Sequence, residues 1–241
     1  MKKILIVTLL VSNLFANANF DKNFKKTIKE VADINVEVQF KKELKSFPAL
    51  FVIGKTQSGD IFPVISSKNG NYFFGLSNVM HLDDKDSSMI RNELNKAQME
   101  KNKQDKVVLD ELFSSFSDND YLFLEGYSKD LPTQIVVSDP DCPYCRKHLE
   151  EIEDTLKVAN VKYIFAPIRK GTASVKSQLI MDETKNLKST KDKIKVIKKY
   201  YKDVELSKKQ LGTNTSQIDK NAQKIFESGV IRGVPFIYEV K

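Results

Sequence analysis

The sequence of 241 residues contains no Trp, only two Cys, nine Gly and seven Pro. So little Gly and Pro excludes collagen-like and low-complexity chains, and two Cys exclude a small scaffold held together by many disulfides. Only the first fifteen residues are apolar enough to consider for a membrane span, which excludes a multi-span membrane protein. Hydrophobic residues at 41% and charged residues at 29% indicate a globular protein of one large domain or two modest ones.

Positive charge exceeds negative charge only slightly, with 39 Lys plus Arg against 32 Asp plus Glu. The basic residues alternate with acidic ones, for example in residues 41–43 and 191–193. They form no basic stripe interleaved with aromatics, which is the pattern that nucleic-acid binding requires. We therefore expect solvated helix faces here and no nucleic acid among the partners.

The first 18 residues are typical of a cleaved signal peptide for export. Residues 2–3 are lysines, residues 4–14 are mostly apolar, and residues 16–18 (Ala-Asn-Ala) place small side chains at the expected cleavage site. The apolar segment is too short to span a bilayer comfortably, and an uncleaved anchor is the alternative interpretation. We expect a mature chain that begins at Asn19 in the periplasm.

Hydrophobic periodicity divides the mature chain into three parts. Residues 19–82 begin with helical spacing and continue with strand-like segments, which predicts a small α+β domain. Residues 83–120 contain no Gly or Pro and begin with acidic residues, which predicts a helical linker. Residues 121–241 alternate strand and helix patterns, which predicts an α/β domain with some parallel pairing. The first domain is near the lower size limit for stability and would gain from pairing with a second copy.

The patterns also place the individual elements. Helices are expected at residues 20–31 and 141–159 and through most of 174–228, with a break at Gly212. Residues 68–70 (Lys-Asn-Gly) are a turn signal between two strands. Strands are expected at residues 36–40, 49–53, 61–65, 72–76, 121–125, 134–137, 161–168 and 235–240.

Both cysteines lie in Cys142-Pro143-Tyr144-Cys145, between a predicted strand and the start of a predicted helix. In an exported protein such a pair is a redox centre, half of a metal site or a structural disulfide. A disulfide that closes so short a loop restrains the unfolded chain very little, so stability is a poor reason for this pair.

The redox interpretation gives the two sulfurs different roles. At the start of a helix, unpaired N–H groups and the helix dipole favour the thiolate of Cys142, which is therefore the predicted nucleophile. The basic residues 146–147 add positive charge nearby, whereas Asp139 and Asp141 oppose it. Cys145, one turn further into the helix, would resolve the mixed disulfide by attacking Cys142.

Two other chemistries could use the same residues. Zinc would need both cysteines with His81 and His148, but His81 is distant in sequence and there is no second closely spaced ligand pair. His148 follows Cys145 by three positions, which also permits a Cys-His hydrolase, but no associated Asn, Asp or oxyanion element is identifiable. We expect neither a metal nor a cofactor.

The segment Ser138-Asp139-Pro140-Asp141-Cys142-Pro143-Tyr144-Cys145 resembles the active-site segment of the periplasmic DsbC/DsbG thiol:disulfide interchange proteins, and is closest to the DsbG form. Gly233-Val234-Pro235-Phe236 resembles the cis-proline loop of that family. The resemblance implies an N-terminal dimerisation domain, a helical linker and a thioredoxin-like domain with a helical insertion. It also implies a homodimer that reshuffles disulfides of exported cysteine-containing clients, with a membrane-bound redox partner.

The resemblance assigns roles to individual residues. Cys142 and Cys145 would be catalytic, and the backbone of Val234 would offer strand-like hydrogen bonds to the client. A cis bond before Pro235 would have to be held in place by its surroundings. The substrate-binding residues would be Pro143, Tyr144, Gly233, Val234 and Pro235.

The sequence departs from the family in three ways. Position 234 is Val, as in the oxidase DsbA, where DsbC and DsbG usually have Thr, so a disulfide donor is an alternative to an isomerase. Residues 134–137 contain no acid to match the buried carboxylate that thioredoxin uses as a proton acceptor. The chain stops six residues after Pro235, so either the sequence is truncated at the C-terminus or residues 235–240 form an edge strand. A dimeric holdase chaperone with secondary redox activity is a further alternative.

Overall fold

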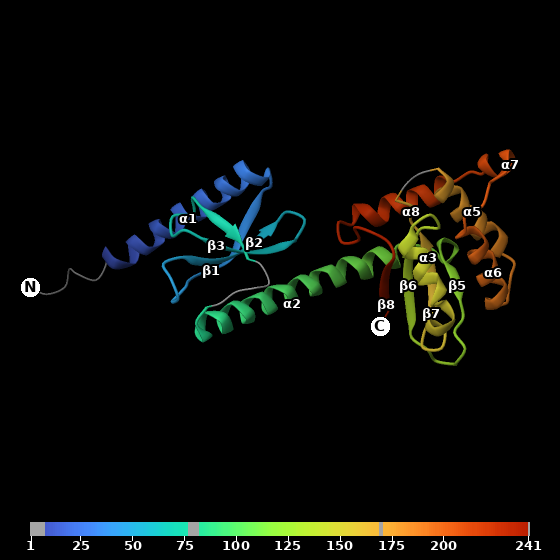
Figure 1. Cartoon of the computed structure of the whole chain (residues 1–241), viewed down its shortest axis with the longest axis horizontal. Helices are drawn as coiled ribbons and strands as arrows, with labels where there is room; N and C mark the ends of the chain where they lie inside the picture. Colours follow the sequence, from blue (N-terminus) through green and yellow to red (C-terminus); the bar gives the residue numbers. More distant parts are fainter. Residues whose placement is uncertain (1–7, 77–81, 169–170, 241) are drawn as a thin grey trace, which may run out of the picture. The chain divides into compact units, whose positions relative to one another are not determined.

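The computed structural model describes residues 8–76, 82–168 and 171–240, with side chains from residue 19 onward. The chain forms two compact units, Met1–Lys106 and Val107–Lys241, and the boundary falls within one long helix (Figure 1). Across the described ranges, no helix is both long and apolar enough to cross a membrane. The expected signal peptide at residues 1–18 and His81 lie outside the described side chains.

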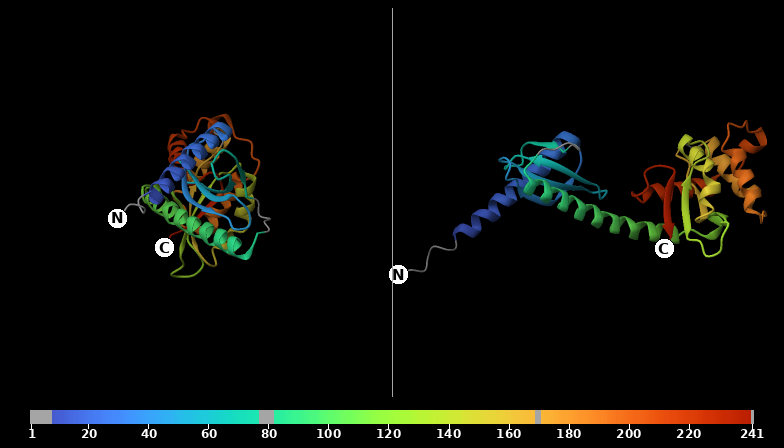
Figure 2. Two further views of the ribbon diagram at one scale, coloured as in Figure 1. Left: turned by 90° about the vertical axis from the view of Figure 1, so that its left-hand side faces the viewer. Right: turned by 60° about the horizontal axis from the view of Figure 1, so that its bottom comes forward.

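The first unit is a four-stranded antiparallel sheet with strands in sequential order. Helix α1 (Thr8–Ala32) precedes β1 (Val36–Glu43), β2 (Leu50–Thr56), β3 (Ile61–Ser66) and β4 (Phe73–Gly75). Helix α2 (Asp84–Ser114) begins in this unit. Figure 2 shows α1 running along the sheet.

Alternation along β2 gives this sheet two apolar faces. Val52 packs with Phe24 in the cluster beneath α1, whereas Phe51 and Ile53 pack on the other face with Ile90 at the start of α2. All five side chains are 1% exposed or less. The predicted α+β unit is therefore built around one sheet buried on both sides.

Two local contacts fix the ends of these elements. The predicted turn at Gly70 has φ +77°, and the hydroxyl of Thr27 in α1 donates a hydrogen bond to the Gly70 carbonyl at 3.2 Å. At the start of α2, Asp86 accepts hydrogen bonds from the backbone N–H groups of Lys45 and Ser46, both at 2.7 Å. Burial opposes ionisation, but these bonds and the Ser46 hydroxyl hold the pKa of Asp86 below its ordinary value.

The second unit has a mixed sheet in the order β5-β7-β6-β8. Strands β6 (Thr133–Ser138) and β7 (Asn160–Phe165) are parallel, and β5 (Leu122–Leu124) and β8 (Phe236–Val240) pair with them antiparallel. Within the described residues β8 pairs only with β6, so it forms the edge that the sequence predicts as one possibility. The remaining elements are η1 (Asp118–Asp120), α3 (Pro143–Glu150), α4 (Ile152–Thr155), α5 (Thr172–Thr184), α6 (Thr190–Tyr200), α7 (Lys208–Leu211) and α8 (Ser216–Glu227).

Alternation along β6 also gives this sheet two buried faces. Val136 packs with Leu149 and Ile197 on the face covered by α3, α4, α5 and α6. Its neighbours Ile135 and Val137 pack on the opposite face with the end of α2 and with α8. The long predicted helix at residues 141–159 is interrupted at Glu151, where φ is −88° and ψ is 5°. The predicted helical stretch at 174–228 consists of the four helices α5 to α8.

Candidate active site

The two cysteines lie where β6 gives way to α3. Strand β6 ends at Ser138, and the Cys142 N–H donates to the Asp139 carbonyl at 3.1 Å, which closes the turn. Cys142 is the residue before the helix, with φ −81° and ψ 122°, and Pro143 occupies the first helical position. Proline is favoured there because its fixed φ suits the helix and no N–H is required. The N–H groups of a first helical turn have no partner within the helix, and they favour negative charge on a residue at this position.

The two sulfurs differ in exposure. Cys142 is half-buried, whereas Cys145 is 1% exposed and packs in the core. The two cysteines lie 3.6 Å apart and are not bonded. Burial raises the pKa of the Cys145 thiol to about 12, against hydrogen bonds from the Ser138 hydroxyl and the Asp139 N–H that favour the thiolate. The pair is thus a dithiol with one accessible sulfur and one sheltered sulfur.

The late Gly-Val-Pro segment lies beside the accessible sulfur. The Val234–Pro235 peptide bond is cis, as the resemblance implies. The Cys142 thiol donates to the Val234 carbonyl, with 3.5 Å between sulfur and oxygen, although the residues are 92 positions apart. Gly233 precedes this bond, and Tyr144 is 74% exposed. The structure therefore places the residues that the resemblance assigns to substrate binding on both sides of Cys142.

Asp139 and Asp141 are the two acidic residues whose negative charge opposes a thiolate at Cys142, and both carboxyl groups accept hydrogen bonds. Asp139 is 4% exposed and accepts hydrogen bonds from the N–H groups of Asp141 and Ile168. Burial raises the pKa of the Asp139 carboxyl, since it outweighs these two bonds. Asp141 accepts from the Lys176 ammonium at 2.7 Å and from the Thr172 hydroxyl at 2.8 Å. Despite burial, these contacts hold the pKa of Asp141 below its ordinary value.

Two basic residues complete this arrangement. Arg146 lies 3.4 Å from Asp141 and 2.8 Å from Asp203. Lys176, whose side chain is only 5% exposed, comes from α5 in the helical insertion. The sequence singles out Arg146 because it follows the cysteines, but no local pattern marks Lys176.

The arrangement around the cysteines gives little support to a zinc site or to a Cys-His hydrolase. No three side chains of His, Cys, Asp or Glu come together as metal ligands in the described part of the chain, and His81 lies outside it. Burial lowers the pKa of His148, whose Nδ1 is buried without a hydrogen-bond partner among the described residues. A neutral histidine in this setting is a packing residue rather than a base for the cysteines.

A half-buried sulfur at the start of a helix, a sheltered second sulfur and an adjacent cis-proline on a mixed sheet together define a thioredoxin-fold protein of thiol:disulfide exchange. The family model described as disulfide isomerase DsbG N-terminal matches residues 24–109. This match, together with a solved DsbG structure, supports a relationship to the DsbC/DsbG family of thiol:disulfide interchange proteins.

Three solved structures are similar to this chain. Helicobacter pylori DsbG is 26% identical with a TM-score of 0.54, over 91% of this chain and 100% of that chain. The alpha-DsbA2 protein of Wolbachia pipientis is 17% identical with a TM-score of 0.39, over 57% and 87% of the two chains. The catalytic domain of Proteus mirabilis ScsC is 17% identical with a TM-score of 0.42, over 56% and 85%. No curated protein matches the sequence.

Proposed function

We propose that this protein is a periplasmic oxidoreductase that isomerises or reduces incorrect disulfides in exported proteins. The observation that carries the proposal is the position of Cys142, half-buried, 3.6 Å from Cys145 and in contact with the Val234 carbonyl. The signal-like residues 1–18 support export. Thiol:disulfide exchange requires no cofactor.

Catalysis begins when the Cys142 thiolate attacks one sulfur of a client disulfide. The client S–S bond breaks, a Cys142–client disulfide forms, and the other client sulfur leaves as a thiolate that takes up a proton. In isomerisation, that freed thiol attacks another client disulfide, and a client thiolate later displaces Cys142 unchanged. The client keeps its number of disulfides, and only their pairing differs.

Reduction requires the second sulfur. The Cys145 thiolate attacks Cys142, the bond to the client breaks, and the client thiolate leaves with both electrons and takes up a proton. The enzyme ends with a Cys142–Cys145 disulfide. A membrane-bound dithiol partner would then have to return two electrons and two protons before the next turnover.

Client binding would use the surface around Cys142. The Val234 carbonyl lies 3.5 Å from the Cys142 sulfur, and an extended client segment could pair with this backbone as an added strand. Tyr144 and Pro143 border the same sulfur on the helix side, and Tyr144 offers an exposed ring to the client.

The first unit would form the homodimer. Its sheet ends at β4, where Phe74 is 62% exposed, and Tyr72 immediately before this strand is 76% exposed. An open strand edge that carries aromatic rings is suited to pairing with a second copy. The match of residues 24–109 to the DsbG N-terminal model supports this assignment.

A disulfide donor is the second candidate, because Val234 is the residue that the oxidase DsbA places before its cis-proline. Refolding of a client with scrambled disulfides tests both candidates and the chaperone alternative. An isomerase rescues the client as the reduced enzyme, and the Cys142→Ser variant loses the rescue. Full rescue by Cys142→Ser would favour a holdase, and rescue only of a fully reduced client by the oxidised enzyme would favour a donor.

A further inference from the structure

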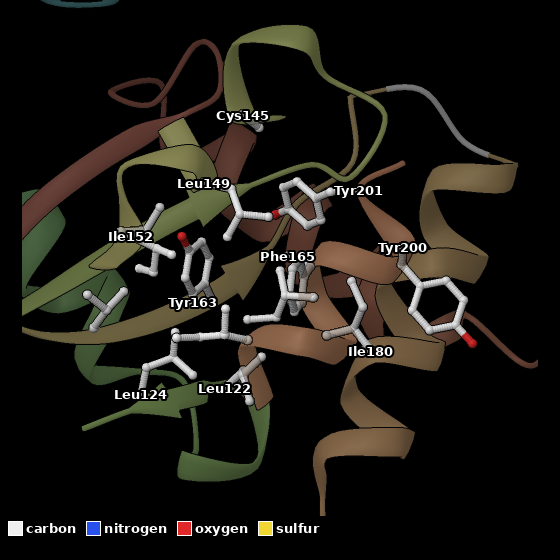
Figure 3. Close-up of a cluster of buried hydrophobic side chains, with 14 of the residues drawn as sticks. Leu122, Leu124, Cys145, Leu149, Ile152, Tyr163, Phe165, Ile180, Tyr200 and Tyr201 are labelled. Atoms are coloured by element: carbon white, nitrogen blue, oxygen red, sulfur yellow. The ribbon is translucent and has the colours of Figure 1, made fainter. Parts of the chain in front are cut away.

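A line of buried hydroxyl groups ends at the Cys145 sulfur. The Tyr201 hydroxyl, just after α6, donates a hydrogen bond of 2.7 Å to the Ser138 hydroxyl at the end of β6. The Ser138 hydroxyl in turn favours the thiolate form of Cys145, which lowers the pKa of that thiol against the effect of burial. All three residues are 3% exposed or less. Figure 3 shows Tyr201 beside Leu149 in the buried cluster, with Cys145 above both in this view.

Each of the two hydroxyl groups carries one proton, and this determines which group donates and which accepts. Burial raises the pKa of Tyr201 far above its ordinary value, so its hydroxyl remains a donor. A serine hydroxyl carries one proton, and because Ser138 accepts from Tyr201, that proton is available to the Cys145 sulfur. Donation by Tyr201 also polarises the Ser138 hydroxyl and makes it a better donor. Both bonds therefore favour negative charge on Cys145.

Ser138 differs from the other groups that the structure describes around Cys145, none of which contributes a side-chain hydroxyl that favours the thiolate. Cys142 lies beside it on α3, and the Asp139 contribution is a backbone N–H rather than the carboxyl group. Tyr163 of β7 is fully buried in the same cluster, but its hydroxyl has no hydrogen-bond partner among the described residues. Ser138 is thus the side chain outside the dithiol that donates to the sulfur.

We propose that Ser138 is a catalytic residue of the resolving step and that Tyr201 is its positioning residue. Cys145 loses its proton to solvent, and the Ser138 hydroxyl stabilises the resulting thiolate while it attacks Cys142. The Cys142–Cys145 bond forms, the bond from Cys142 to the client breaks, and the client thiolate takes up a proton. The serine keeps its own proton throughout. This role rests on the proposed function but concerns only the second sulfur.

A small disulfide reagent separates the two sulfurs without any client. When reduced protein meets dithiobis(nitrobenzoate), attack by Cys142 releases one thionitrobenzoate and leaves a second attached to Cys142. Attack by Cys145 then releases the second in a phase whose rate does not depend on reagent concentration. Stopped-flow absorbance follows both phases across a range of pH, and the Cys145→Ser variant defines the trace in which the second phase is missing.

We expect Ser138→Ala to slow the second phase about tenfold and Tyr201→Phe to slow it several-fold, with the first phase unchanged. A plot of the logarithm of the second-phase rate against pH should rise with the same slope for the wild type and the variants. The Ser138→Ala curve should be shifted by about one pH unit toward higher pH relative to the wild-type curve. Ser138→Thr, which keeps the hydroxyl, should restore most of the rate. Tyr163→Phe removes a buried hydroxyl without a hydrogen-bond partner in the same cluster and should leave both phases unchanged.

Equal second phases in wild type, Ser138→Ala and Tyr201→Phe would overturn the proposal. Equal slowing by Tyr201→Phe and Tyr163→Phe would also overturn it, since it would indicate loosened packing rather than a hydrogen bond. Failure of the wild type to rescue scrambled clients, with two normal phases in this assay, would instead count against the proposed function alone.

Discussion

The Lys176 ammonium lies 2.7 Å from the carboxylate of Asp141, the residue that precedes Cys142 in the sequence. The Lys176 side chain is almost completely buried. Its Nζ also donates to the Lys202 carbonyl at 3.2 Å. One buried cation thus joins the start of the catalytic helix to the helical insertion. It also offsets the negative charge that lies closest in sequence to the nucleophile.

Lys176→Met is therefore expected to slow alkylation of Cys142 by iodoacetamide at neutral pH. Asp141 would keep its negative charge with only Arg146 and Thr172 beside it, which leaves more uncompensated negative charge next to the reacting sulfur. The same change should lower the free energy of unfolding by about 2 kcal/mol, as measured in urea, because it leaves a partly buried carboxylate without its closest cation. The Lys176→Met/Asp141→Asn double variant is the control and should recover most of the alkylation rate. An unchanged rate in Lys176→Met would show that this ion pair does not influence the nucleophile.

Stability should depend on pH differently in the two redox states. The pKa of Cys145 is raised to about 12 by burial, from an ordinary value of 9.0. Below pH 9 the thiol is protonated in both folded and unfolded chains, and its contribution to stability is complete. Between pH 9 and 12 the unfolded chain loses this proton first, so the free energy of unfolding of the reduced protein should fall by up to about 1.4 kcal/mol per pH unit.

The oxidised protein is the internal control, because its disulfide cannot titrate. Burial raises the pKa values of Tyr163 and Tyr201 in both forms, so the difference between the two urea series reports the cysteines together with the charge of Cys145 on these two tyrosines. Parallel curves for the two forms above pH 9 would contradict the raised pKa of Cys145.

The turn that anchors α1 should tolerate no side chain at Gly70. Its φ is +77°, and an added Cβ would lie 2.7 Å from the Phe20 carbonyl oxygen and 2.9 Å from the Phe24 nitrogen. Gly70→Ala is expected to lower the free energy of unfolding of the first unit by about 3 kcal/mol, from backbone strain and the clash together. Gly59→Ala is a matched control, since φ is +85° and the space is open, and should cost about 1 kcal/mol. Equal losses in urea unfolding would mean that the contact with α1 has no cost.

The exposed aromatic of β4 should control dimerisation. Phe74→Glu is expected to raise the dissociation constant of the homodimer at least about tenfold, measured by sedimentation, because it places a charge on the proposed pairing edge. The control is Val31→Glu, which changes an apolar residue of α1 in the same unit that is 72% exposed, against 62% for Phe74. If the Phe74→Glu protein stays dimeric at the lowest measurable concentration, the dimer interface does not lie at β4.

The features that could be predicted from sequence are those with a local signal. Alternating apolar and polar residues mark β1, a compact apolar run marks β2, and a Cys-Pro-Tyr-Cys segment after a strand marks the start of a helix. The interruption at Glu151 has no such signal, because no Gly or Pro lies nearby and the apolar positions Leu149, Ile152 and Leu156 keep helical spacing across it.

The residues that surround the two sulfurs could not be predicted in the same way. Lys176 reaches Asp141 across 35 positions, and Tyr201 reaches Ser138 across 63. A lysine or tyrosine in a helical segment gives no indication that it is buried beside a distant turn. The missing acid in β6 is visible in the sequence, but the hydroxyl groups found near Cys145 become apparent only once the insertion is folded against the sheet.

The helical insertion touches each sulfur through a different residue: Lys176 on α5 acts next to Cys142, and Tyr201 after α6 acts beneath Cys145. Detachment of these helices would remove both influences together while leaving the two cysteines at the start of α3. The chemistry of the two sulfurs would then depend on whether the helical insertion is docked against the sheet.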